Sequence, residues 1–458
     1  MNLAGVRSGV VLEFGSKALA MSDYIYMLES HLSTDQNRVV AEVEAAAGQA
    51  NVNLFLTGGA MRDMLAGFRI RDLDFSVEGN AVKVAKAVSD RSGAKIVSLD
   101  ENRKSAELVF ATGVTAQIAM SRQEKYARSG AKPQVSATTI QEDLRGRDFT
   151  CNAIALSLNR ASRGLLLDPM NGLADLERRE LRLTNPYGLY DDPSRLLRLV
   201  RFQVRLGFTI EERTQMQVAN AREAEVEKLI PPRVFFEELK RISAEDSPAE
   251  ILKALEEANL LGLFSPALTG PKANLQGLAK FEKLAKLLPD DSRTRAARQG
   301  PFFYVLTEKL NAKEKQALIK STEMHKPEVD VWQKLEAKAK KLETALRSAR
   351  IRKASQVYFL VTEAAPEDVL FVMYHSAVKP VQERLRNYFQ KYLPAIQEVT
   401  PDEWAAVEAK AGARKNNKVR DEFIADRLDR RVRKPPEPPP PAPVVEAPRP
   451  AIRGRGPM

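Results

Sequence analysis

The chain has 458 residues, 44% of them hydrophobic and 29% charged, which is typical of a globular protein with about two to four domains. No apolar run approaches the roughly 18–20 residues that a membrane span needs, and the N-terminal segment lacks the apolar core and cleavage site of a signal peptide. The single cysteine, Cys151, excludes an intrachain disulfide and a cysteine-based zinc site, which is typical of a protein from a reducing compartment. We therefore expect a cytoplasmic protein, and the absence of a long apolar run predicts that it has no membrane segment. The net charge of +11 favours a polyanionic partner, although a basic chain can also have none.

The first part of the chain alternates between helical and extended patterns. Apolar residues three and four apart predict helices, and short apolar runs next to glycine or polar residues predict strands. In chain order we expect a helix around Tyr24–Leu32, a helix over Val39–Gln49, a strand over Val52–Gly58, a helix over Met61–Gly67, a strand over Asp72–Val77, a helix over Ala81–Ser92, and strands over Lys95–Ser98, Ala106–Phe110 and Ala116–Ala119. This alternation continues to about Asn159 and predicts an α/β or α+β head domain.

After Leu165–Asp168 the pattern is helical, with almost no strand signal. The expected helices are Ser194–Leu206, Ile210–Ala221, Arg233–Ser243, Ala249–Ala258 and a long helix over Val329–Arg350, with Val357–Ala364 as a helix or a short strand. The last stretch, Lys434–Met458, is too rich in proline to pack and is expected to be a disordered basic tail.

The most informative segment holds two aspartates that follow a glycine pair. Asp72 and Asp74 are two residues apart on a predicted strand, so their carboxylates project from the same face. Two carboxylates this close repel each other unless a cation lies between them, and Mg²⁺ combines such oxygen ligands with phosphate oxygens. Gly58 and Gly59 supply backbone N–H groups that phosphates can approach closely. The segment therefore predicts a metal-dependent nucleotide site.

A second polar group follows further along the chain. Arg147 stands beside Asp148, and Asn152 follows four residues later. At a junction between a strand and a helix, these side chains can orient a ribose or a phosphate. A surface ion pair would explain the same residues equally well.

A third motif combines a helix start with a row of arginines. Asp192 can cap the start of a helix, and Pro193 suits the first position of that helix. Arg195, Arg198 and Arg201 then form one stripe, and their like charges repel unless an anion such as a triphosphate or RNA phosphate lies against them. The alternative is a solvated basic face. Asp192 and Arg195, one turn apart, can together complement the hydrogen-bonding edge of cytosine or adenine.

Taken together, these motifs resemble those of the class II tRNA nucleotidyltransferase/poly(A) polymerase family. Its patterns GGxxRD with DxD, RRDxxxNA, DPxxG and EDxxR with an arginine stripe correspond here to GGAMRD with DLD, GRDFTCNA, DPMNG and DDPSR continuing to RLVRF. The resemblance covers roughly residues 50–270. It implies a polymerase-β-like head followed by all-α neck, body and tail domains. The domains would be an N-terminal extension at residues 1–37, the head at 38–160, the neck at 161–245, an RNA-binding body and tail at 246–433, and the proline-rich tail at 434–458.

The resemblance also implies an activity: addition of CMP and AMP, from CTP and ATP, to the 3′ end of tRNA without a nucleic-acid template. By similarity, Asp72 and Asp74 would be catalytic and would hold two Mg²⁺ ions, while Asp192 and Arg195 would pair with the incoming base. The other residues that would bind or surround the nucleotide are Gly58, Gly59, Arg62, Asp63, Arg147, Asp148, Asn152, Arg198 and Arg201.

Three positions depart from the family pattern. Gln117 stands where many relatives have an acid, Gly146 replaces the first arginine of RRD, and Asp191 replaces a common glutamate. The three histidines include no His-Asp doublet, which excludes the metal-dependent phosphohydrolase module of some relatives. The alternatives are an enzyme that adds only A or only CC to tRNA, a bacterial poly(A) polymerase acting on other RNA 3′ ends, or an RNA-binding protein with a decayed head. Nothing in the sequence indicates an oligomeric state.

Overall fold

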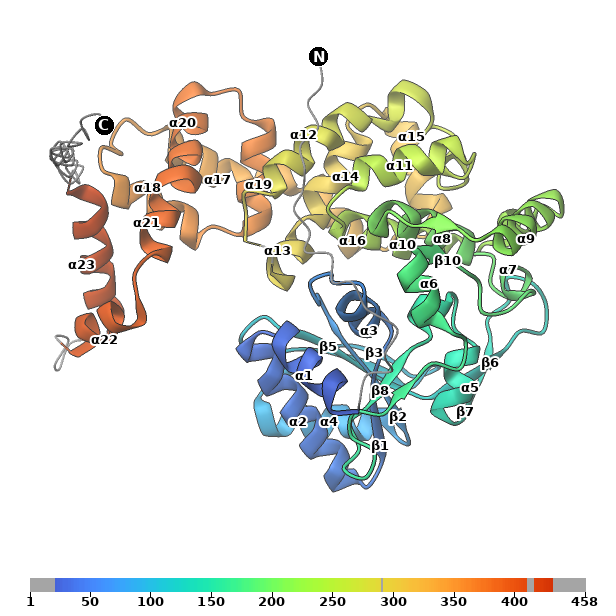
Figure 1. Ribbon diagram of the computed structural model, residues 1–458. Coiled ribbons are helices and arrows are strands. Elements are labelled where there is room, and N and C mark those ends of the chain that lie inside the picture. Colours follow the sequence, from blue (N-terminus) through green and yellow to red (C-terminus); the bar gives the residue numbers. More distant parts are fainter. Residues whose placement is uncertain (1–20, 290, 410–415, 431–458) are drawn as a thin grey trace, which may run out of the picture.

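The computed structural model describes residues 21–289, 291–409 and 416–430. The proline-rich stretch Lys434–Met458 and the first 20 residues of the expected N-terminal extension lie outside the described residues. Figure 1 shows a head built around a sheet, with a row of helices arching over it and away from it. The predicted combination of a mixed α/β head and a helical remainder is confirmed.

A seven-stranded sheet forms the centre of the head, in the strand order β3-β4-β5-β2-β1-β8-β9. All neighbouring strands are antiparallel except β2 and β5, which are parallel. The strands are β1 (Asn53–Thr57), β2 (Leu73–Glu78), β3 (Lys95–Asp100), β4 (Ser105–Val109), β5 (Thr115–Met120), β8 (Ala155–Ser157) and β9 (Leu166–Leu167), and the helices of the head are α1 (Met21–His31), α2 (Thr34–Ala50), α3 (Gly58–Leu65), α4 (Ala81–Ser92) and α5 (Ile140–Arg145).

The two faces of the sheet have different surroundings. Leu54 and Leu56 of β1 join the main core, whereas Phe55 between them packs with Ile140 and Leu144 of α5 in a separate cluster. This alternation is the two-residue period of a strand. In the pairing of β1 with β2, Phe55 lies opposite Ser76, so the even-numbered residues of β2 share the face that α5 partly covers. Asp74 is therefore on that face, away from the main core.

A small hairpin of β6 (Arg122–Lys125) and β7 (Gln134–Ala137) extends from the end of β5. Its four-residue strands are polar and are not predicted from the sequence, because alternation between apolar and polar residues is the signal for a strand. The short helix η1 (Thr150–Asn152) then leads the chain back to the central sheet at β8.

The rest of the described chain is almost entirely helical. A two-stranded parallel pair, β10 (Glu180–Leu181) with β11 (Thr209–Ile210), is the exception. The helices are α6 (Gly172–Arg178), α7 (Gly188–Asp191), α8 (Arg195–Leu206), α9 (Glu212–Glu223), η2 (Val226–Leu229), α10 (Pro232–Ala244), α11 (Pro248–Glu257), η3 (Leu261–Leu263), η4 (Gly270–Ala273), α12 (Leu275–Ala285), α13 (Ser292–Ala297), α14 (Gln299–Thr307), α15 (Ala312–Ser321), α16 (Lys326–Gln333), α17 (Leu335–Arg347), α18 (Ala354–Glu363), α19 (Pro366–His375), α20 (Lys379–Asn387), η5 (Tyr388–Tyr392), α21 (Leu393–Gln397), α22 (Pro401–Ala409) and α23 (Asn416–Asp429).

One predicted helix is wrong. The long helix expected over Val329–Arg350 is divided into α16 and α17 by a turn at Lys334. Val329, Trp332 and Leu335 are all buried, and they are spaced three residues apart. In one straight helix, two successive spacings of three residues would turn the last side chain away from the face of the first. The turn brings all three side chains into the core. None of the helices in the described ranges is both long and apolar enough to cross a membrane.

Candidate active site

The two predicted catalytic aspartates lie at the start of β2. Asp74 belongs to the strand, and its Oδ2 accepts the backbone N–H of Gly59 at 3.1 Å. Asp72 precedes the strand, and its Oδ1 accepts the hydroxyl of Thr115, the first residue of β5, at 2.6 Å. Burial, and then the charge of Asp72, raise the pKa of Asp74 to about 6. The charge of Asp72 thus disfavours the ionisation of Asp74, which a cation between the two carboxylates would reverse.

The glycine pair is required by this packing. Gly58 has φ +63°, and a Cβ added there would lie 3.0 Å from Nη1 of Arg147 and 3.4 Å from Oδ2 of Asp74. A Cβ on Gly59 would lie 3.1 Å from the same Asp74 oxygen. The pair forms the first turn of α3, so this helix begins three residues before the predicted Met61. Backbone N–H groups at a helix start attract anions, as the prediction of phosphate binding requires.

Arg147 lies against the glycine turn, as the sequence predicts for a residue of the site. Its Nη2 donates to Oδ2 of Asp143 at 2.8 Å and to Oγ of Ser76 at 3.0 Å, and the side chain is only partly buried. Its charge favours the ionised form of Asp74. Arg147 is therefore held in place by Asp143 with part of its guanidinium still accessible.

Four other predicted nucleotide contacts are buried and bond to one another. Arg62 is 3% exposed and donates to Asp63 at 2.7 Å and to Oδ1 of Asn152 at 2.7 Å. Asn152 in turn donates to Oδ1 of Asp148 at 3.1 Å. In this structure the polar groups of these four residues face each other inside the protein, and their predicted role in nucleotide binding stays a prediction. They join α3 to η1 beneath the glycine turn.

The predicted base-reading pair is divided between two roles. Asp192 is half-buried, and its Oδ1 accepts the backbone N–H of Ser194 at 3.1 Å, which fastens the start of α8. Arg195 is 8% exposed and donates to the backbone carbonyls of Arg147 at 3.1 Å and Gly146 at 2.9 Å. Its Nε is buried without a hydrogen-bond partner among the described residues. Base pairing by Arg195 would require these carbonyl bonds to be exchanged.

The arginine stripe of α8 is neutralised by acids of the protein itself. Arg198 pairs with Asp148 at 2.6 Å and keeps about a third of its side chain exposed. Arg201 is buried between Glu238 of α10, at 2.6 Å, and Glu245, at 3.1 Å. Burial opposes the charge on Arg201, but the two glutamates outweigh it and raise the arginine's pKa. Arg201 thus faces acids of the protein in this structure, whereas Arg198 is partly accessible, and the predicted role of both arginines around the nucleotide stays a prediction.

Two features that sequence reasoning missed border this site. Arg295 of α13 is 10% exposed and lies 3.9 Å from Oδ1 of Asp72, and α13 descends toward the head in Figure 1. No local pattern signals a contact between residues so far apart in the chain. Tyr126, next to the β6–β7 hairpin, has its pKa raised by burial and by the charges of Glu124 and Asp192. The hairpin thus lies near Asp192 at the start of α8.

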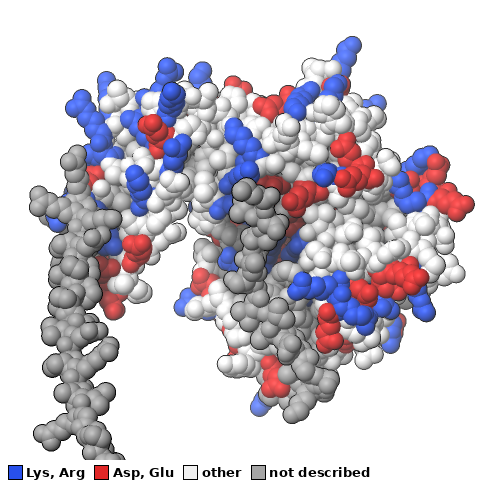
Figure 2. Space-filling model, turned by 45° about the horizontal axis from the view of Figure 1, so that its top comes forward, with Lys and Arg blue, Asp and Glu red and all other residues white. Residues whose placement is uncertain are grey.

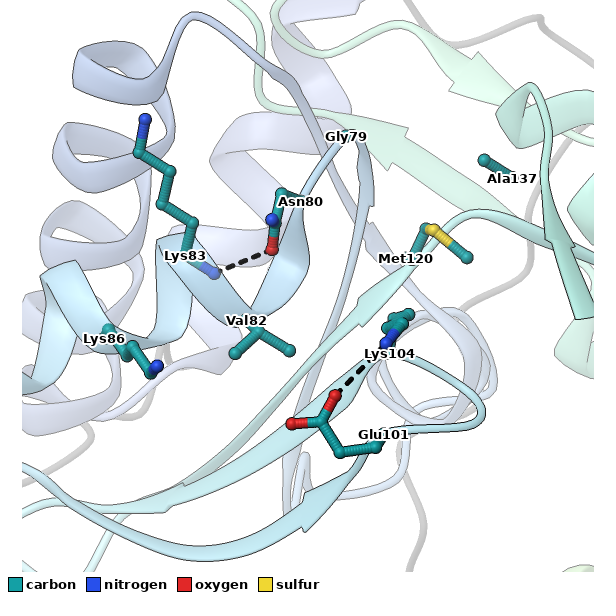
Figure 3. A pocket seen from close by; sticks show the side chains of 9 residues that line it. All are labelled: Gly79, Asn80, Val82, Lys83, Lys86, Glu101, Lys104, Met120 and Ala137. Atoms are coloured by element: carbon teal, nitrogen blue, oxygen red, sulfur yellow. Dashed lines mark hydrogen bonds and ion pairs between the residues drawn. The ribbon is translucent and has the colours of Figure 1, made fainter.

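A separate pocket opens at the other end of β2 and β5 (Figure 3). It is lined by the β2–α4 turn, including Asn80 and Lys83, by Lys104 of the β3–β4 turn, and by Met120 at the end of β5. Because β5 begins beside Asp72 and runs parallel to β2, its last residue lies at the edge of the sheet opposite the aspartates. This pocket is therefore not the predicted nucleotide site.

The donor set at the aspartates fits a divalent cation. Both ligands are carboxylates, which Mg²⁺ and similar hard ions prefer, and phosphate and water oxygens complete the coordination of such ions. Within the described residues, no three His, Cys, Asp or Glu side chains converge on one point. A cation here would thus need oxygen atoms from its substrate.

Comparison with known proteins agrees with this geometry. Residues 54–182 match the family model of the poly A polymerase head domain. The chain is 25% identical over 446 residues to the A-adding tRNA nucleotidyltransferase of Geobacter sulfurreducens, which covers 92% of this chain and 48% of the relative. It is 35% identical over 249 residues to the A-adding tRNA nucleotidyltransferase of Halalkalibacterium halodurans, covering 53% of this chain and 58% of the relative.

A third relative is the CC-adding tRNA nucleotidyltransferase of Deinococcus radiodurans, 35% identical over 206 residues, with 45% of this chain and 54% of the relative covered. The chain spans about half the length of these curated relatives. A solved structure of a CCA-adding enzyme in an apo form has the same fold, with a TM-score of 0.52 and 23% identity over 90% of this chain and 96% of that one. Residues 54–182 thus match a poly A polymerase head domain, and the chain is similar to A-adding and CC-adding tRNA nucleotidyltransferases.

Proposed function

We propose that this protein adds CMP and AMP to the 3′ ends of tRNA, taking CTP and ATP as substrates and releasing pyrophosphate. The observation that carries this proposal is the position of Asp74, half-buried at the start of β2 against the N–H of Gly59, with the Asp72 carboxylate beside it. A carboxylate pair next to a helix N-terminus is a site for a divalent cation and a phosphate chain together. The names of the relatives supply the class of RNA substrate.

Asp72 and Asp74 are the residues that would hold the cation, which we propose is Mg²⁺. When bound, such ions activate the attacking hydroxyl and stabilise the leaving oxygen in phosphoryl chemistry. The chain's own contribution would be to orient the nucleotide. The N–H of Gly59 holds Asp74 in place, the start of α3 at Gly58 would receive the phosphates, and Arg147 places a guanidinium beside this turn. Arg198, partly exposed on α8, is the remaining basic group of the stripe for a phosphate or a base.

The helices beyond the head support an RNA partner. Figure 2 shows Lys and Arg side chains gathered over the C-terminal helices, at the upper left of that view. Basic residues that are exposed in the turn before α17, on α17 and in the loop after it are Lys334, Lys338, Lys340, Lys341, Arg347, Arg350, Arg352 and Lys353. Phosphate contacts of this kind bind RNA through counterion release and make the affinity depend on salt.

The second candidate is a partial activity, the addition of A alone. Its support is the match over 92% of the chain to a relative named as A-adding. The two candidates differ in whether the site accepts CTP. The structure bears on this only through Asp192 and Arg195, whose predicted roles in reading the base stay a proposal.

Incubation of the full chain with Mg²⁺ and defined tRNA ends tests the proposal. Three tRNA substrates would be supplied, lacking CCA, ending in C or ending in CC, each with CTP, ATP or both, and the products sized. Addition that needs both nucleotides and stops after CCA supports the main proposal, and addition of A only to tRNA ending in CC supports the second. Long A tails on unrelated RNA would show a poly(A) polymerase instead. An Asp74→Asn variant serves as the matched inactive control, and no incorporation by the unmodified protein would contradict both candidates.

A further inference from the structure

Three side chains form a row across the open face of the sheet beside Asp72. In the pairing of β2 with β5, Asp74 lies directly opposite Gln117, and in the pairing of β5 with β4, Gln117 lies directly opposite Glu107. Residues directly opposite on neighbouring strands share a face of the sheet. Asp74, Gln117 and Glu107 therefore point to the same side, with Gln117 in the middle.

The row ends in an exposed acid. Gln117 and Glu107 are both exposed, whereas Ala106 and Leu108, on either side of Glu107, are buried in the main core. The alternation shows that Glu107 faces away from that core and toward the side of Asp74.

The charge of Asp72 is felt at Glu107. Partial desolvation by the surrounding chain, and then the charge of Asp72, raise the pKa of Glu107, while Lys240 of α10 opposes this shift. Charges influence each other in this way only over short distances. The carboxyl of Glu107 therefore borders the space around Asp72, and Lys240 borders it from α10.

We propose that Glu107 is the third carboxylate of the cation site. The position between Asp74 and Glu107 in the row, where a third carboxylate would be nearer to Asp74, is occupied by the neutral Gln117. The proposal rests on the cation site of the proposed function. Two strand spacings of about 4.8 Å separate Asp74 from Glu107 along the row, and in the described part of the chain no three acids converge on one point. Glu107 would therefore be a positioning residue that holds a water molecule next to the cation.

An exchange of the two side chains tests this role. Mn²⁺, a probe that replaces Mg²⁺ and is visible by electron paramagnetic resonance, would be titrated into the full chain without nucleotide or RNA. We expect Glu107→Gln to weaken Mn²⁺ binding by about tenfold or more, the usual effect of losing an outer partner of a metal site. Adding Gln117→Glu to that variant should restore the affinity to within about threefold, because the carboxylate then returns to the same row, one strand nearer to Asp74.

Glu101→Gln is the matched control, since it removes the same charge from the exposed β3–β4 turn at the far end of β4. This variant should bind Mn²⁺ as tightly as the unmodified protein. Thermal melting of each variant, measured without metal, shows whether it is folded. Unchanged Mn²⁺ affinity in a folded Glu107→Gln variant would overturn the inference, as would an exchange variant that stays as weak as Glu107→Gln.

A second readout separates this inference from the proposed function. In nucleotide incorporation, we expect Glu107→Gln to require about tenfold more Mg²⁺ for half-maximal rate, with a smaller loss at saturating metal. If the unmodified protein incorporated no nucleotide, the proposed function would fail, while the Mn²⁺ titration would still decide the role of Glu107. The inference alone would fail if three results came together. The unmodified protein would incorporate nucleotides, the Asp74→Asn variant would incorporate none, and the Glu107→Gln variant would match the unmodified protein in both assays.

Discussion

The half-buried carboxylate of Asp74 should make the metal-free protein less stable than an Asp74→Asn variant. Burial and the charge of Asp72 raise the pKa of Asp74 from 3.8 to about 6. Each pKa unit corresponds to about 1.4 kcal/mol, so the ionised carboxylate costs up to about 3 kcal/mol of folding free energy. The asparagine removes the charge and can still accept the N–H of Gly59.

The pH dependence follows from the direction of the shift. Because the folded state holds the proton more tightly than the unfolded state, the cost is complete above the folded pKa of about 6 and disappears as the pH falls toward 3.8. The advantage of Asp74→Asn should therefore be largest near neutral pH and above. It should fade in mildly acidic solution.

Thermal melting in EDTA measures this difference. At about pH 8 the variant should melt several degrees higher than the unmodified protein, and at about pH 4 the two should melt together. Added Mg²⁺ should reverse the order, because only the unmodified protein gains stability by binding the ion. Asp90→Asn, which removes an exposed carboxylate from α4, is the control and should change neither value. A variant that is less stable than the unmodified protein at pH 8, or whose advantage does not depend on pH, would refute the reasoning.

Three further substitutions separate the roles of the site residues. Gly58→Ala should lower incorporation by about a hundredfold, because its Cβ would lie 3.0 Å from Arg147 and displace the turn, and a melting curve close to that of the unmodified protein should accompany the loss. Arg201→Met should destabilise the fold by about 3–5 kcal/mol in urea unfolding, since it leaves the buried Glu238 with only its longer ion pair to Arg241 at 3.5 Å, and the ratio of CTP to ATP use by the folded fraction should not change. Arg195→Ala should reduce discrimination between CTP and ATP by about tenfold in a competition assay, and unchanged discrimination would contradict its role in reading the base.

The local part of the site was predictable because its signals are close together in the chain. Asn80 caps α4 and Gly93 ends it in the left-handed region, so the helix has the predicted bounds, Ala81–Ser92. In the same way, the glycine turn and the strand of Asp74 follow from a few neighbouring residues. The predicted domain boundaries and the assignment of roles to single residues stay predictions.

Burial was not predictable from local patterns. Arg62 and Arg201 look like binding residues in the sequence, yet each is buried against partners that lie up to 90 positions away. The hairpin of β6 and β7 was missed for a related reason, since its short polar strands are stabilised by pairing with each other and by their attachment to β5.

The sequence by itself determined the class of fold and the core of the chemistry: an α/β head, a helical remainder, and a carboxylate pair behind a glycine turn. These features depend on backbone freedom, strand periodicity and helix caps, which act over a few residues. Only the tertiary structure decided which charges face the site. It turned Arg62 and Arg201 inward, brought Arg295 from α13 to within 3.9 Å of Asp72, and aligned Glu107 with Asp74 across the sheet. The physical reason is that a charged side chain can be buried only where it meets groups that pair with it. Strand pairing and helix packing bring these groups together from distant parts of the chain.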